Sequence, residues 1–435
     1  MTALTEKLID AVRLDLTPSL GVTEPGAIAY AAAAAARALK RKPEKVTCRL
    51  NSGIYKNSFT CFVPGTDGMG CAFAAALGAV GGDPALRLGA LENITKIDIN
   101  EAKRLVDEGC ANAFLGDISP EISITAEVVS GDERAEAVIE GRHDRLVSLK
   151  VNGVETLEAG ASALSQDEGP AFRVSSAGFE NIVRCLYEDG VADGLGFLDE
   201  AVRMDLALFE EGRRAGLMPL TLARAGSGTT CRERALLLTC GAIEARVRGA
   251  KAPAMAITGS GSHGILCTLP VHEAAVFHGC GRDDERKALL LSALVTMYIK
   301  ENSGLLSSAC GCVLAGGTGA ALGLTYLLAV RENGEIPTPD ELIKLLSNAL
   351  NSMAASVTGM ICHGGNTGCS LKAAVGVDMA FAAAEMAVKG LGAESVHGIL
   401  GPTPDLTILN MARIARDMLP VEETILDIMA ENNNN

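Results

Sequence analysis

Four cysteines in the last third of the chain are the residues best suited to bind a soft metal. They lie in two uncharged, glycine-rich stretches, Cys310-Gly-Cys312 and Cys362-His-Gly-Gly-Asn-Thr-Gly-Cys369. Thiolates favour soft or borderline metals, and iron–sulfur clusters are usually held by cysteine. Neither spacing is diagnostic of a cluster or a zinc site, and free cysteines also serve as small apolar core residues. The residues alone leave both an iron–sulfur site and buried core thiols open.

A group of polar residues stands at the start of an alanine-rich segment, in Gly21-Val-Thr-Glu-Pro25. Thr23 can cap a helix, Glu24 favours the positive end of the helix dipole, and Pro25 lacks an N–H that would be unpaired there. The run Ala27–Leu39 then predicts a helix, which Lys40-Arg-Lys-Pro43 ends. Such a helix start favours an anionic ligand, although an ordinary cap has the same composition.

Two further segments combine polar groups that suit a small anionic substrate. Ser52-Gly-Ile-Tyr-Lys-Asn57 lies between the predicted strands Val46–Leu50 and Ser58–Val63, and presents a cation and an amide together. A solvated lysine is the alternative there. Thr258-Gly-Ser-Gly-Ser-His-Gly264 is a predicted loop that can aim several N–H groups at one anion, with His263 as a proton carrier. A tight connection is the alternative for this second segment.

Several common site types lack support in this sequence. P-loop, Rossmann and zincin motifs are absent. A pyridoxal phosphate cup at the Ser/Gly loop would need a lysine for the Schiff base, and no lysine is singled out by its context. The net charge of −15, with no run of cations longer than Lys40-Arg-Lys42, argues against a nucleic-acid partner.

Apolar periodicity and the turn residues that interrupt it predict the helices and strands that position these residues. Cys71–Val80 predicts a small-residue helix, and the alternating runs Ile122–Val129, Ala135–Glu140 and Leu146–Val151 predict a β meander. Helical patterns dominate afterwards, at 178–190, 196–215, 229–249, 285–301, 305–330, 339–357 and 369–390. We expect an α+β protein with a predominantly helical core domain and a smaller β-containing lobe. The expected domains are a helical core with the site (1–115 and 240–435, including short strands near 46–63), a small β lobe (116–160) and a helical connecting region (161–239).

Composition predicts a globular chain packed through small residues. Hydrophobic residues make up 48% and aromatics only 3%, with 48 glycines, so we expect helix-on-helix packing and a homodimer. Thirteen cysteines without an apolar signal segment indicate a reducing cytoplasm. The uncharged stretch 303–330 is long enough to span a bilayer, but its glycines and missing aromatic belt favour buried helices over a membrane span.

Seven segments, taken in order along most of the chain, resemble the L-cysteine desulfidase family. That family is related to the alpha part of iron–sulfur L-serine dehydratases. Seven collinear segments are much more specific than any one of them. They are Gly21–Gly26, Ser52–Asn57, Val63–Thr66, Ala74–Asp83, Gly259–Ile265, Cys310–Cys312 and Gly359–Gly365.

The resemblance implies a PLP-independent lyase of amino-acid catabolism, which converts L-cysteine to pyruvate, ammonia and sulfide with an oxygen-sensitive [4Fe-4S] cluster. Three cysteines would hold three irons, and the open fourth iron would act as a Lewis acid on the leaving group while a base removes the α-proton. Cys312 and Cys362 are the first two expected ligands, with Cys369 or Cys310 as the third. The substrate amino acid is expected at Thr23, Lys56, Asn57, Ser260, Ser262 and Gly264, and the proton carriers are expected among Glu24, His263 and His363.

Two departures from the family pattern keep alternatives open. The family normally has Cys, thought to be a cluster ligand, where this chain has Val22, and commonly has Asp at the position of His363. Loss of one thiolate weakens a cluster unless another ligand substitutes. The alternatives are an L-serine dehydratase-like lyase and a cluster-less paralogue that binds an amino acid without turning it over.

Overall fold

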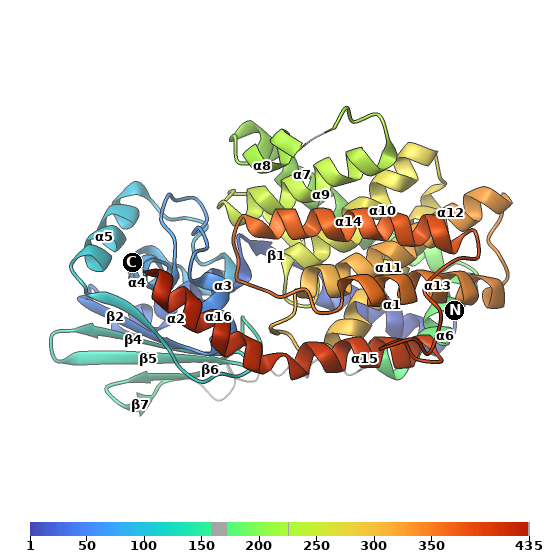
Figure 1. Cartoon of the computed structure of the whole chain (residues 1–435). Coiled ribbons are helices and arrows are strands. Elements are labelled where there is room, and N and C mark those ends of the chain that lie inside the picture. Colours follow the sequence, from blue (N-terminus) through green and yellow to red (C-terminus); the bar gives the residue numbers. More distant parts are fainter. Residues whose placement is uncertain (158–171, 225, 434–435) are drawn as a thin grey trace.

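The computed structural model describes residues 1–157, 172–224 and 226–433 of the 435-residue chain. These residues form a large helical part and a smaller part built on a sheet (Figure 1). Each part has its own hydrophobic core. The predicted α+β class, with a predominantly helical core and a smaller β-containing lobe, is confirmed. The predicted boundary between residues 160 and 161 lies outside the described residues.

The smaller part is built on a six-stranded sheet with the order β3-β2-β4-β5-β6-β7. Strands β2 and β3 run parallel, and the other neighbours are antiparallel. The meander predicted from alternation is confirmed as β4, β5 and β6, and it shares one sheet with β2. The strands are β2 (Lys45–Leu50), β3 (Ala111–Leu115), β4 (Ser123–Ser130), β5 (Glu133–Glu140), β6 (Leu146–Val151) and β7 (Val154–Glu155).

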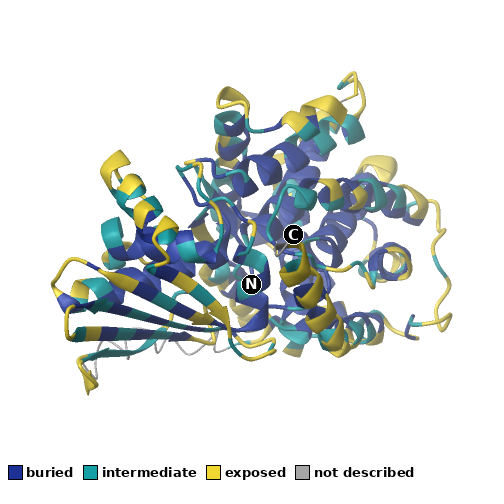
Figure 2. Ribbon diagram, turned by 60° about the vertical axis from the view of Figure 1, so that its left-hand side comes forward, coloured by how far each residue is buried: buried dark blue, intermediate teal, exposed yellow. Residues whose placement is uncertain are grey.

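Small-residue helices cover one face of this sheet. They are α2 (Thr23–Leu39) and α4 (Cys71–Gly81), both close to their predicted bounds, with η1 (Pro84–Gly89) and α5 (Lys96–Asp107) beside them. A Cβ atom at Gly78 would lie 2.2 Å from the carbonyl oxygen of Ala29, so glycine is required for this close approach of α4 to α2. Strand residues alternate between buried and more exposed positions, as expected for a sheet covered on one face (Figure 2).

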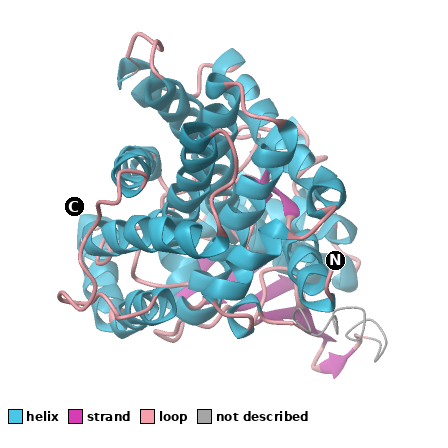
Figure 3. Ribbon diagram, turned by 90° about the vertical axis from the view of Figure 1, so that its right-hand side faces the viewer, coloured by secondary structure: helices cyan, strands magenta, loops and turns pink. Residues whose placement is uncertain are grey.

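The helical part surrounds the buried helices α10, α11 and α12, and Figure 3 shows it in front of the strands. A short two-stranded sheet, β1 (Thr17–Leu20) with β8 (Pro253–Ala256), lies between its helices. The helices longer than one turn are α1 (Ala3–Asp15), α6 (Phe179–Arg184), α7 (Gly196–Arg214), α8 (Pro219–Arg224), α9 (Cys231–Val247), α10 (Gly261–His278), α11 (Arg282–Ser303), α12 (Thr318–Asn333), α13 (Pro339–Val357), α14 (Gly368–Ala387) and α15 (Pro404–Asp417).

The uncharged stretch around residues 303–330 contains a core helix. A π-helical turn, Cys312–Gly317, leads directly into α12, and together they form a 22-residue helix long and apolar enough to cross a membrane. Within its most apolar window 94% of the residues are buried inside the protein. The predicted start of this helix at residue 305 was wrong, since residues 304–310 form an irregular segment and the helix begins at Gly311.

The predicted strand Ser58–Val63 is wrong. Residues Ser52–Ser58 form the short helix α3, and Phe62 alone makes an isolated bridge, with Met69. Strand β2 already lies between β3 and β4, so neither of its edges is free to pair with this segment. The alternating apolar residues there are buried by packing instead of by strand pairing.

Several helices were not predicted from periodicity, among them α1, α5 and α8. The Ser/Gly segment ends in the first turn of α10, so Ser262, His263 and Gly264 are helical and not part of a loop. Helix α15 and the terminal α16 (Leu419–Asn433) were also missed. Helix α16 runs from the helical part toward the sheet and contacts α3 (Figure 1).

We expect Asp205→Asn to flatten the pH dependence of stability. Asp205 on α7 is fully buried, its Oδ1 accepts from the Met255 N–H at 2.9 Å, and its Oδ2 lies 3.0 Å from the Thr268 hydroxyl. Burial raises the pKa of Asp205 from 3.8 to about 7. Between these two values the folded state holds the proton and the unfolded state does not, so stability falls as pH rises.

The neutral amide of asparagine keeps both hydrogen bonds and removes this titration. Urea unfolding across that window should show a wild-type slope of up to about 1.4 kcal/mol per pH unit from this residue. The variant should lack that contribution. Parallel slopes for both proteins would contradict the assignment.

Candidate functional site

Two segments far apart in the sequence bring the cysteines together. Ala309 and Ile361 form an isolated antiparallel bridge. The Cys310 N–H donates to the Met360 carbonyl oxygen and the Cys362 N–H to that of Ser308, both at 2.7 Å. Cys312 begins the π-helical turn, and Cys369 lies in the first turn of α14. The bridge therefore places the two predicted cysteine stretches side by side.

The four thiols share one electrostatic environment. A hydrogen bond between Cys310 and Cys312 lowers the pKa of Cys310 to about 6 and raises that of Cys312 well above its ordinary value. Charges on Cys369 and Cys362 raise the pKa of Cys312 further. Burial raises the pKa of Cys369 to about 12. A thiolate is therefore favoured at Cys310 over Cys312.

The donor chemistry of this group fits an iron–sulfur cluster. In the described ranges, no three His, Cys, Asp or Glu side chains converge as ligands of a single metal ion. A single zinc ion needs thiolates about 2.3 Å from one centre, whereas the irons of a cluster are each held by cysteine thiolates. Thiols as the donor set suit a soft metal and exclude a hard cation such as Ca²⁺. The thiols are thus the type of ligand that an iron–sulfur cluster requires, although they are not arranged as a site for a single metal ion.

Val22 borders the thiol group. It precedes the first residue of α2 and forms a small buried cluster with Cys61 and Val247, against which Cys369 packs. A Cβ atom at Gly365 would lie 3.1 Å from Val22 Cγ1. Position 22, where the resembling family has a cysteine, therefore faces the loop between Cys362 and Cys369.

Helices α2 and α3 reach the thiols through one hydrogen-bond chain. Asn57 Nδ2 donates to Glu24 Oε1 at 2.7 Å, and the Cys362 thiol donates to Asn57 Oδ1 at 3.6 Å. Glu24 is largely buried. Three residues singled out from the sequence, each in a different segment, are therefore joined directly.

Lys56 is paired inside the protein. Its Nζ lies 2.5 Å from Glu422 Oε2, and the two side chains are only 1% and 2% exposed. The Ser308 hydroxyl donates to the same carboxylate oxygen at 3.2 Å. The cation predicted to meet a substrate carboxylate thus already has a carboxylate partner on α16. Nothing in the local sequence around Glu422 indicated this pairing.

His263 lies buried at the start of α10, close to the backbone between Cys310 and Cys312. Its Nδ1 is 2.8 Å from the Thr258 hydroxyl, and burial lowers its pKa well below the ordinary value, so the ring is neutral. A Cβ atom at Gly311 would lie 2.8 Å from His263 Nε2 and 3.2 Å from Lys300 Nζ. Only glycine lets this backbone approach both groups.

Lys300 on α11 was missed by the sequence analysis. It is buried, and burial lowers its pKa to about 8, while Cys312, Cys362 and Cys310 act in the opposite direction. Its only signal in the sequence was a lysine at the end of a long apolar helix, which is also typical of a helix C-terminus.

The other predicted residues take less central places. Asn366 Nδ2 donates to His363 Nδ1 at 3.1 Å, within the loop before α14. A Cβ atom at Gly264 would lie 1.8 Å from the Met255 carbonyl oxygen, so this glycine is required for packing of α10 on β8. Ser260 precedes α10 without a side-chain capping bond. Ser262 accepts a hydrogen bond from the buried Arg246.

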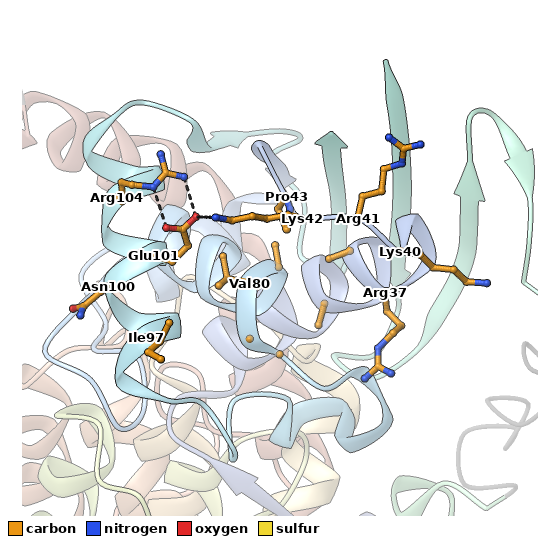
Figure 4. Close-up of a pocket in the computed structure, with 15 residues that line it drawn as sticks. Arg37, Lys40, Arg41, Lys42, Pro43, Val80, Ile97, Asn100, Glu101 and Arg104 are labelled. Carbon is orange, nitrogen blue, oxygen red and sulfur yellow. Dashed lines mark hydrogen bonds and ion pairs between the residues drawn. The ribbon is translucent and has the colours of Figure 1, made fainter. Parts of the chain in front are cut away.

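A surface pocket in the smaller part is lined by other residues than those of the thiol group. It has a volume of about 950 Å³ between α2, α4 and α5, and Figure 4 shows Glu101 between Lys42 and Arg104. Glu101 lies 2.9 Å from each of these cations. None of the predicted site residues lines this pocket, so it is not the candidate active site.

Most of the chain, including much of the candidate site, matches a known protein family. The family model described as Serine dehydratase alpha chain matches residues 122–427. The match includes all four site cysteines, His263 and Lys300. Val22, Glu24 and Asn57 lie before it, so the site combines matched and unmatched parts of the chain.

Full-length relatives narrow the assignment. UPF0597 proteins from Clostridium botulinum (strain Langeland), Geobacter sulfurreducens and Caldanaerobacter subterraneus subsp. tengcongensis are 34%, 33% and 32% identical to this chain. The alignments cover 98%, 97% and 97% of both partners. This chain belongs to the UPF0597 family and contains a serine dehydratase alpha chain domain. The relationship to serine dehydratases expected from the motifs is confirmed, whereas these matches do not name a cysteine desulfidase.

Proposed function

We propose that this protein is a lyase of a small amino acid that uses a [4Fe-4S] cluster, with L-cysteine as the first candidate substrate and L-serine as the second. One observation carries the proposal: four thiols from two distant segments gather beside the Glu24–Asn57 pair and Lys300. The serine dehydratase alpha chain match supports the reaction class. A reducing cytoplasm, which we also propose, keeps these thiols free.

Cys312, Cys362 and Cys369 are the proposed ligands. Cys369 is the third because it packs against Val22, the position that the resembling family fills with a cysteine. When bound, the cluster supplies an open iron that acts as a Lewis acid on the leaving group. Cys310, which is hydrogen-bonded to Cys312, is then a free thiol beside the proposed ligands.

Glu24 is the proposed base for the α-proton. Asn57 holds its Oε1, whereas its Oε2 has no hydrogen-bond partner in the described part of the chain and can accept a proton. Neutral His263, fixed by Thr258, lies beside Lys300 and can relay protons at Nε2. Thr258 has a left-handed backbone with φ 51°, and the side chain of Asp15 accepts from its N–H, so this orienting residue is itself fixed.

Anaerobic reconstitution with iron and sulfide tests the proposal. The protein should acquire acid-labile sulfide and broad visible absorbance, and should release pyruvate from L-cysteine or L-serine. The ratio of kcat/KM for the two amino acids then names the substrate. Protein that stays iron-free and forms no pyruvate from either would overturn the proposal.

A second candidate function is an amino-acid-binding protein without a cluster. It is favoured by Val22 in place of a cysteine and by the absence, among the described residues, of an assembled single-ion site. Its signature is stabilisation of the metal-free protein by an amino acid without product formation.

We expect Val22→Cys to increase cluster retention. A thiol at this position would face Cys369 and the loop at Gly365, adding a fourth proposed ligand to the group. Iron per chain after exposure to air should be at least about twofold higher than in wild type, because a cluster ligand bond is added. Val22→Ser, similar in size but without a thiolate, is the control and should show no gain.

A further inference from the structure

We propose that Arg246 binds the α-carboxylate of the amino-acid substrate, in a buried pocket that Thr23 and Ser262 complete. The inference rests on the proposed lyase function and identifies the group that holds the substrate in place. Arg246 was not among the residues singled out from the sequence.

The guanidinium group of Arg246 is buried without a counter-charge. The residue is 3% exposed and lies near the C-terminal end of α9. Its Nη1 donates to Ser262 Oγ at 2.9 Å and its Nη2 to Thr23 Oγ1 at 3.2 Å, while Nε is buried without a partner. No carboxylate in the described parts of the chain forms an ion pair with it.

Such an arrangement is costly unless an anion completes it. A buried charge normally has an opposite charge beside it, because desolvation of an unpaired ion outweighs hydrogen bonds to neutral hydroxyls. The next arginine on the same helix end shows the usual solution: Arg248 Nε lies 3.1 Å from the buried Glu244. Arg246 thus differs from Arg248 by lacking a carboxylate partner among the described residues.

A second buried group with a free nitrogen lies in the same environment. His143, in the turn between β5 and β6, is 7% exposed, and its Nε2 has no hydrogen-bond partner among the residues that the structure describes. A Cβ atom at Gly259 would lie 3.4 Å from its Nδ1. Glu24 and Arg246 act in opposite directions on the pKa of His143, which burial lowers. A turn of the sheet part therefore shares the electrostatic environment of Arg246 and Glu24.

Arg246 and Thr23 adjoin the thiols through the residues next to them in the chain. Thr23 follows Val22, and Arg246 precedes Val247, and these two valines pack with Cys61 against Cys369. A small amino acid can therefore have its carboxylate at Arg246 and its side-chain leaving group toward the thiols. The planar fork of arginine matches the two oxygens of a carboxylate.

Calorimetric titration of the iron-free protein tests this pocket independently of catalysis. The probes are L-serine and L-cysteine, each paired with its analogue lacking the carboxylate, ethanolamine or cysteamine. Wild type should bind at least one amino acid about 100-fold more tightly than its analogue, because the buried arginine–carboxylate pair is lost with the analogue. Arg246→Gln should abolish this difference, Arg246→Lys should retain part of it, and the matched control Arg248→Gln should keep all of it.

Stability separates a binding role from a structural one. Because Arg246 lacks a counter-charge, Arg246→Met should unfold at the wild-type temperature or above it. A lower midpoint together with unchanged amino-acid affinity in Arg246→Gln would make the residue structural and overturn the inference. Equal affinity of wild type for amino acid and analogue, or no binding of either, would also overturn it. Carboxylate-dependent binding without cluster or pyruvate formation would instead overturn only the lyase proposal.

Discussion

Cys362→Ser should abolish turnover and cluster assembly while the chain stays folded. Cys362 lies beside Ser308 through its backbone and contacts Asn57 through its thiol, so it joins the cysteine stretches to the Glu24 side of the site. Loss of groups that merely support metal ligands costs 10–100-fold, so loss of a ligand should reduce pyruvate release at least about 100-fold. Iron content, acid-labile sulfide and pyruvate formation after anaerobic reconstitution measure the effect.

Cys280→Ser is the matched control. Cys280 is a partly exposed thiol just after α10, at the opposite end of that helix from His263. Its serine variant should assemble the cluster and turn over as wild type does. Full activity in Cys362→Ser, or equal losses in the two variants, would remove Cys362 from the proposed ligand set.

Lys56→Met should destabilise the protein by about 3–5 kcal/mol, because it leaves the buried carboxylate of Glu422 without its charge partner. The same change should loosen α16, since Glu422 is the ion-pair link from that helix to α3 in the described structure. Urea unfolding gives the free energy, and protease cleavage within residues 419–433 reports the release of α16.

A double variant distinguishes the cost of leaving one buried charge unpaired from the net contribution of the ion pair. Lys56→Met with Glu422→Leu removes both charges and should recover most of the lost stability, since buried ion pairs contribute little net energy over apolar residues. Arg13→Met breaks the exposed Arg13–Asp10 pair and should cost less than about 1 kcal/mol. An equal loss in the free energy of unfolding for Lys56→Met and Arg13→Met would contradict the prediction, because burial of the Lys56–Glu422 pair would then have no effect on stability.

The Cys362 and Lys56 predictions concern two adjacent residues of α3, Asn57 and Lys56, which have different partners. Asn57 reaches the thiol side, whereas Lys56, one residue earlier, faces α16. The segment Ser52–Asn57 was interpreted from the sequence as a turn that presents both groups to one substrate. Its helical form directs the two side chains to different partners, since adjacent residues of a helix do not share a face.

Signals between near neighbours in the chain determined much of the fold. Glu24 and Pro25 favour the start of α2, and apolar alternation specifies β4, β5 and β6, because these signals depend on residues a few positions apart. The expected cap at Thr23 was wrong, since Val22 is the N-cap without a side-chain capping bond and the Thr23 hydroxyl accepts from Arg246 instead. The sequence also identified the four cysteines and Glu24 by their residue types. The strand expected at Ser58–Val63 did not form beside β2, because β3 and β4 already pair with both sides of that strand.

Only the tertiary structure decided which of these groups meet. Lys56 pairs with Glu422 across 366 positions and Arg246 reaches Thr23 across 223, and no local pattern encodes either contact. That Arg246 forms no ion pair with a carboxylate of the described residues is likewise visible only when the elements around it are in place. Residue type and spacing specify which chemistry is available, whereas burial and charge pairing depend on contacts that form when distant segments pack together.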